Sequence, residues 1–250
     1  MPTRDTSDWQ PIVRARAYEQ VLEQIEERIL DGRLAAGDHL PSEREFAATL
    51  GISRPSIREA LRVIEALGIV QIRRGAGRDS GAVLMSSPGD GLMNLLKLQI
   101  ALATFSWDDV LNTRMALEIW CVEEAAWRAN PDDHAQLGEI LDRMDAPTID
   151  SAEFNRLDAA FHVRIAESTG NALTAHFMGS LRTAIHHQMV KMYAELENWR
   201  ETAKTVRAEH RAILQAIVDR DRTLAAGLMR RHIADFYDIP TFQGANQPSP

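Results

Sequence analysis

Four side chains in the second half of the chain have the types and spacing of a metal-binding site. Asp158 and His162 stand four residues apart in "LDAAFH", so in a helix they project from one face, about one turn apart. His210 in "EHRAIL" and His232 in "RRHIADF" each lie on or near an apolar helical stripe. If these segments are helices packed side by side, one carboxylate and three imidazoles converge inside the protein. This donor set suits Zn²⁺, Ni²⁺ or Mn²⁺, of which we favour zinc.

The number of ligands bears on what such an ion can do. Each histidine taken alone is more often a core or surface residue than a ligand, so it is the combination that favours a metal site. Four ligands complete a tetrahedron, whereas an octahedral ion keeps two positions for water or a small bidentate acid. Arg114 is a candidate to bind the carboxylate of such an acid, as an effector of the protein, through two parallel hydrogen bonds. The alternative is a structural salt bridge with Glu118, one helical turn further along.

A second cluster of chemistry-bearing residues is basic. Residues 52–78 contain six arginines and two acidic residues, although the chain as a whole has a net charge of −8. Arg54 and Arg58 share one helical face, opposite an apolar stripe, and suit guanine edges or phosphates. Ser53 and Ser56 lie at the start of the same helix, where free backbone N–H groups favour phosphate. The distribution therefore predicts a local DNA-binding surface on an acidic protein.

The segments that carry these arginines predict a winged helix-turn-helix. Ser42 and Glu45 form a capping box, and Gly51 stands in a short turn between two helices. Alternating residues then predict a two-stranded hairpin, with Arg74 and Gly75 at its tip. The predicted helices are 15–31, 42–50 and 53–67, and the predicted strands are 69–74 and 82–85.

The rest of the chain predicts an all-helical bundle. After a linker at 86–91, "SSPGDG", apolar spacing is helical and no strand pattern occurs. We therefore predict a mostly α protein, with a winged domain at 10–85, a bundle of six or seven helices at 92–238 and a disordered tail at 239–250. The predicted helices are 92–103, 107–129, 132–144, 151–169, 171–196, 200–219 and 221–236.

Length and composition exclude several classes of protein. The chain has 250 residues, 45% of them hydrophobic, which is normal for a globular protein of two domains. No apolar run approaches the roughly 18 residues that cross a bilayer, and the N-terminus lacks a secretory signal. Cys121 is the one cysteine, so no internal disulfide forms. We expect a cytoplasmic protein without a membrane partner.

The first domain resembles a known family. Residues 40–77, "LPSEREFAATLGISRPSIREALRVIEALGIVQIRRGAG", closely resemble the DNA-binding domain of the GntR family of bacterial transcription regulators. The resemblance implies DNA contacts by a set of residues that the spacing only partly singled out. They are Arg44, Ser53, Arg54, Ser56, Arg58, Arg74 and Gly75.

The second domain resembles the FCD effector domain of the FadR-type branch of that family. The similarity is carried by "RMALE", "LDAAFHVRIAESTGN" and "EHRAILQAI". In metal-binding members the ligands correspond to Asp158, His162, His210 and His232, all of which are present here. The resemblance also implies small organic acids, such as hydroxy or sugar acids, as effectors bound at the metal.

The combined reading is a ligand-responsive transcription regulator and not an enzyme. One chain supplies one reader of a DNA half-site, so a palindromic operator predicts a two-fold homodimer. Two alternatives stay open at this point. One is a metalloenzyme acting on small acids, which has no evident spare acid or base beside the ligands. The other is a regulator whose metal is structural or is itself the signal.

Overall fold

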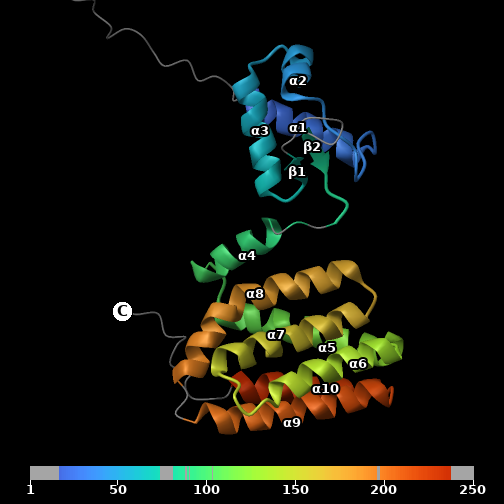
Figure 1. Ribbon diagram of the computed structural model, residues 1–250, viewed down its shortest axis with the longest axis vertical. Coiled ribbons are helices and arrows are strands. Elements are labelled where there is room, and N and C mark those ends of the chain that lie inside the picture. Colours follow the sequence, from blue (N-terminus) through green and yellow to red (C-terminus); the bar gives the residue numbers. More distant parts are fainter. Residues whose placement is uncertain are drawn as a thin grey trace, which may run out of the picture. The chain divides into compact units, whose positions relative to one another are not determined.

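The computed structural model divides the chain into two compact units, residues 1–91 and 92–250. It describes residues 17–73, 81–87, 89, 91–102, 104–195 and 198–237. Over this part of the chain there are ten helices and one two-stranded sheet (Figure 1). The predicted fold class, a winged helix-turn-helix followed by a helical bundle, is confirmed, with element ends that differ from the predicted ones by one or two residues.

The first unit is a small helical domain with a hairpin. Ser42 caps α2 and exchanges hydrogen bonds with Glu45, as the capping box predicts. Gly51 has a φ of +65°, which lets the chain turn directly into α3. Buried side chains of α1 and α3 pack together with the sheet, and Ile57 in the first turn of α3 is fully buried. The elements are α1 (Ala17–Leu30), α2 (Glu43–Leu50), α3 (Arg54–Ala66), β1 (Val70–Arg73) and β2 (Gly81–Leu84).

The hairpin is antiparallel and short. Val70 pairs with Leu84 and Arg73 with Gly81. Glu65 of α3 accepts a hydrogen bond from the backbone N–H of Ile72 at 3.0 Å, which ties the hairpin to the helix before it. Residues 10–16, which were predicted within this domain, and the hairpin tip at 74–80 lie outside the described residues.

The second unit is a helical bundle. Capping boxes open α5 at Ser106 and α6 at Asn130, and Asp150 caps α7. α7 packs against α5, α6 and α8, while α10 packs against α5 and α9. The elements are α4 (Gly91–Ala101), α5 (Trp107–Arg128), α6 (Pro131–Met144), α7 (Ser151–Ser168), α8 (Ala172–Glu195), α9 (Trp199–Val218) and α10 (Arg222–Tyr237). The tail predicted at 239–250 is outside the described residues.

The described core of the bundle is mainly apolar, and its buried ionisable side chains gather at one place. Phe154 and Phe161 of α7, Ile213 of α9 and Ile233 of α10 are all fully buried. Cys121 is buried in the same core, and burial, together with the nearby Glu118, raises the pKa of its thiol to about 12. None of the described helices is both long enough and apolar enough to span a membrane. These ionisable side chains form a buried cluster between the helices of the bundle.

Candidate metal centre and DNA-binding face

Three helices bring the four predicted donors together. α7 carries Asp158 and His162, α9 carries His210 and α10 carries His232. One ligand atom from each residue lies within 4.8 Å of the others, and all four side chains are buried. The i, i+4 pair thus meets two histidines that are distant in sequence.

The distances suit a single ion. Nε2 of His210 lies 3.2 Å from Nε2 of His232 and 3.5 Å from Oδ1 of Asp158. Nε2 of His162 lies 3.9 Å from the same carboxylate oxygen. Two ligand atoms bound at about 2.1 Å to one ion are separated by about 3.0 to 4.2 Å, depending on the angle between them. These three separations fall within that range.

One buried nitrogen supports a metal ligand more directly. Within the described part of the chain, Nε2 of His162 has no hydrogen-bond partner, although the side chain is completely buried. A buried polar atom without a partner costs free energy. An ion bound by the cluster would supply that partner, so the residues fit a divalent metal.

Electrostatics keep two of the histidines neutral. Burial, and then the positive charge of Arg182, lower the pKa of His162 to about 4. Burial, followed by the neighbouring His232 and His162, lowers the pKa of His210 well below its ordinary value. A metal ligand must be deprotonated, so both imidazoles are in the binding form at neutral pH.

Two further carboxylates support the cluster, and sequence reasoning assigned neither a role at the site. Glu118 of α5 forms an ion pair with Nδ1 of His162, and Glu209 of α9 lies 2.6 Å from Nδ1 of His232. Glu118 appeared in the sequence only as a salt-bridge partner for an arginine. Glu209 stands directly before a candidate ligand in "AEHR", which was the one signal available for it.

Arg114, the predicted effector contact, is buried in an ion pair. Its Nε lies 2.5 Å from Oε1 of Glu118, which is the alternative that the spacing had left open. Arg182 of α8 lies 3.5 Å from the same oxygen and 3.3 Å from Oδ2 of Asp158. Although burial alone would raise the pKa of Glu118, these two guanidinium groups hold it well below its ordinary value. No sequence pattern pointed to Arg182.

The predicted DNA contacts lie on and beside the first turns of α3. Arg54 and Arg58 are exposed and lie one turn apart on α3. Arg44 on α2 is also exposed. Ser53 caps α3 by accepting a hydrogen bond from the backbone N–H of Ser56 at 3.4 Å. The other two predicted contacts, Arg74 and Gly75, lie outside the described residues.

A carboxylate of α2 engages the arginines of this face. Glu43 accepts two hydrogen bonds from Arg58, at 3.1 and 2.7 Å, and lies 3.7 Å from Arg54. The hydrogen bond from Arg58, against a smaller opposing effect of burial, lowers the pKa of Glu43. The carboxylate of Glu43 thus engages both of these exposed arginines.

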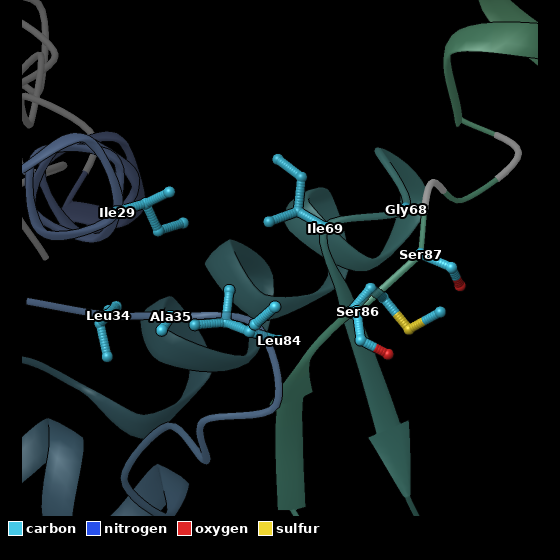
Figure 2. A pocket seen from close by; sticks show the side chains of 10 residues that line it. Ile29, Leu34, Ala35, Gly68, Ile69, Leu84, Ser86 and Ser87 are labelled. Carbon is cyan, nitrogen blue, oxygen red and sulfur yellow. The ribbon is translucent and has the colours of Figure 1, made fainter. Parts of the chain in front are cut away.

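The first unit also has an apolar groove of about 380 Å³ (Figure 2). It lies beside Gly68, which follows the C-terminal end of α3, and hence away from the arginines that begin that helix. Among the residues that the structure describes, no ionisable side chain lines it, so we assign it no DNA contact. Its lining is Ile29, Leu34, Ala35, Ala36, Gly68, Ile69, Leu84, Met85, Ser86 and Ser87.

Comparison with known families agrees with this division of the chain. The family described as "Bacterial regulatory proteins, gntR family" matches residues 17–78, and the FCD domain matches residues 109–235. The second match contains all four clustered donors, and the first contains α2 and α3.

Individual relatives extend over most of the chain. It is 30% identical to the HTH-type transcriptional repressor NanR of Klebsiella aerogenes over 228 residues, which is 89% of this chain and 85% of the relative. It is 28% identical to the Glc operon transcriptional activator of Escherichia coli strain K12, covering 86% of this chain and 85% of the relative. The solved structure of Streptococcus agalactiae GntR shares the fold, with a TM-score of 0.59 at 24% identity over 88% of this chain and 98% of that one.

Proposed function

Because the chain belongs to the GntR family of bacterial regulatory proteins and carries an FCD domain, we propose that it senses a small organic acid at a divalent metal ion and adjusts its operator binding accordingly. Members of this family are DNA-binding transcription regulators with an effector domain and are not enzymes. The metalloenzyme alternative is therefore set aside. The finer parts of the proposal concern the ion, the acid, the DNA contacts and the assembly.

The ion would be held by Asp158, His162, His210 and His232, with zinc favoured and nickel or manganese as alternatives. A bound divalent ion supplies a concentrated positive charge and open coordination positions for the oxygens of an acid. The single observation that carries this part is the convergence of four buried donors within 4.8 Å of one another.

The charge balance around the cluster favours an anionic effector. Arg114 and Arg182 offset Glu118 and Asp158, and metal-bound histidines are neutral. Glu209 adds one more negative charge, so a divalent ion leaves this buried site with a net charge of about +1, where the interaction with an anion is strong. A carboxylate meets this requirement, and hydroxy or sugar acids add a second oxygen for chelation. An acid that reached Arg114 would compete with Glu118 for its guanidinium group.

On the DNA side, α3 would enter the major groove with its N-terminal end. Arg54 and Arg58 would read base edges or phosphates, and Arg44 would contact the backbone. Ser53 and Ser56 would bind phosphate at the start of the helix. We also assign the wing residues Arg74 and Gly75 to the DNA interface.

The proposed assembly is a homodimer on a palindromic operator in the cytoplasm. Each chain has one winged unit and therefore reads one half-site, so a two-fold pair matches a palindrome. An acid that binds one arrangement of the effector bundle more tightly would change the spacing of the two readers by population shift. The sign of the response is separate from this proposal, because the relatives include a repressor and an activator.

The test measures DNA affinity with and without metal and acid. A DNA fragment selected by the protein from a random pool is labelled, and its binding is followed by fluorescence anisotropy at fixed salt. L-Lactate, glycolate, malate, citrate and gluconate are added to the zinc-loaded protein and to protein stripped with a chelator. We expect at least one acid to change the affinity about fivefold or more, corresponding to roughly 1 kcal/mol of coupling, in the zinc-loaded protein only.

The matched variant is Asp158→Ala, which should bind less zinc by elemental analysis and lose the response to acid while still binding DNA. An equal response with and without metal would remove the ion from the acid's site. A change in DNA affinity with zinc alone would make the metal the signal. An effect of zinc on melting temperature, with no effect of any acid on DNA affinity, would make the metal structural.

A further inference from the structure

We propose that Glu209 and Glu118 are positioning residues that hold the ring proton of two histidines on Nδ1, so that the nitrogens facing the cluster carry lone pairs before any ion binds. The inference rests on the proposed metal site and adds residues that lie outside the four candidate ligands. It depends on where each carboxylate meets its imidazole ring.

Glu209 engages the far side of His232. Its Oε2 lies 2.6 Å from Nδ1 of His232, a distance typical of a charge-assisted hydrogen bond. A carboxylate only accepts hydrogen bonds, so Nδ1 of this ring is the donor and carries a proton. The other ring nitrogen, Nε2, then presents its lone pair 3.2 Å from Nε2 of His210, inside the cluster.

Glu118 does the same for His162. It lies in ion-pair contact with Nδ1 of that ring, while Nε2, which has no hydrogen-bond partner among the described residues, faces the cluster. Arg114 and Arg182 hold the other oxygen of Glu118, at 2.5 and 3.5 Å, so the carboxylate is fixed in place. Arg182 also lies 3.3 Å from Oδ2 of Asp158, whose Oδ1 is the oxygen nearest the histidines.

The third histidine is held by a different contact, which makes the inference specific to two rings. Nδ1 of His210 is buried and has no hydrogen-bond partner among the residues that the structure describes. Its ring instead stacks on Phe161, with centroids 4.5 Å apart and an interplanar angle of 27°. Packing orients this ring, and no carboxylate of the described residues contacts its Nδ1.

Glu209 is the residue that mutation can test cleanly. Its side chain is 27% exposed, so replacing it leaves no deeply buried charge unpaired. Glu209→Ala removes the acceptor, whereas Glu209→Gln keeps an acceptor oxygen and removes the charge. Glu201→Gln is the matched control, because Glu201 is an exposed residue two turns earlier on the same helix.

The measurement is the zinc dissociation constant of the full-length protein, obtained by competition with a chromophoric chelator. Loss of an outer-shell partner typically weakens metal binding about 10- to 100-fold. We expect a loss of that size for Glu209→Ala, a smaller loss for Glu209→Gln and none for Glu201→Gln. In urea, each of the four metal-free proteins should still unfold in one cooperative transition, with a lower midpoint for Glu209→Ala because it loses one hydrogen bond.

The outcomes separate this inference from the proposed function. A wild-type protein that binds no stoichiometric zinc overturns the proposed metal site and this inference together. A wild-type protein that binds zinc, with Glu209→Ala within twofold of it, overturns the inference alone.

Glu118 is buried between two guanidinium groups, so we test its role by spectroscopy of the wild-type protein and not by mutation. In the metal-free wild-type protein, ¹⁵N NMR of the imidazole rings should show the proton on Nδ1 of both His162 and His232. A proton on Nε2 of either ring would refute the assignment for its glutamate.

Discussion

Replacing Glu43 by Gln tests whether the arginines that begin α3 are DNA contacts. In the DNA-free protein the carboxylate of Glu43 accepts both hydrogen bonds from Arg58 and lies 3.7 Å from Arg54. Phosphate binding by either arginine must compete with this internal anion. Glu43→Gln removes the competing charge and leaves the shape of the side chain nearly unchanged.

The size of the effect follows from the exposure of the pair. The side chains of Arg58 and Glu43 are 47% and 30% exposed, and ion pairs of this kind contribute about 0.2 to 1 kcal/mol. Removing the competition should therefore raise non-specific DNA affinity by up to about fivefold, since 1.4 kcal/mol corresponds to a factor of ten. If an arginine forms one additional contact with a DNA phosphate, the plot of log K for DNA binding against log [salt] becomes steeper by about 0.9.

The assay is fluorescence anisotropy with a random-sequence duplex at several salt concentrations. Glu26→Gln on α1 is the control, because it makes the same change in net charge at another exposed position of the same unit. We expect Glu43→Gln to bind more tightly than Glu26→Gln. Equal behaviour of the two variants, or weaker binding by Glu43→Gln, would refute the competition between Glu43 and DNA.

Two other predictions address the same two sites. Arg54→Ala and Arg58→Ala should each weaken binding to the selected operator, by about 1 to 3 kcal/mol where the arginine reads a base, while the protein stays folded; unchanged affinity in a gel-shift titration would remove that residue from the interface. The metal-free protein should lose stability as the pH falls from 6.5 towards 4, because burial and Arg182 lower the pKa of His162 to about 4, so in this window the unfolded chain binds more protons. Protonation of His162 in the unfolded chain alone lowers the free energy of unfolding by about 2 kcal/mol between pH 7.5 and pH 5. Urea titrations in the presence of a chelator measure this change, and a free energy of unfolding that does not vary with pH would contradict the neutral, buried state of the ring.

Much of the local structure could be read from short stretches of sequence. The Ser42–Glu45 capping box, the turn at Gly51 and the helical spacing around Asp158 depend on atoms a few residues apart. Interactions over this range are governed by backbone geometry that the residue types themselves specify. The same argument predicted that Arg54 and Arg58 share an exposed face of α3.

Tertiary structure decided which side chains meet. Helical periodicity indicates which face of a helix is buried, but not which helix covers it or at what height along the axis. The gathering of His210 and His232 around Asp158 depends on how α7, α9 and α10 pack, and so do the contacts of Glu118 and Glu209 behind the rings. The sequence by itself determined the donors and the fold class, because both follow from residue type and local spacing. The packing of helices distant in sequence turned those donors into one buried cluster and supplied the carboxylates that orient it.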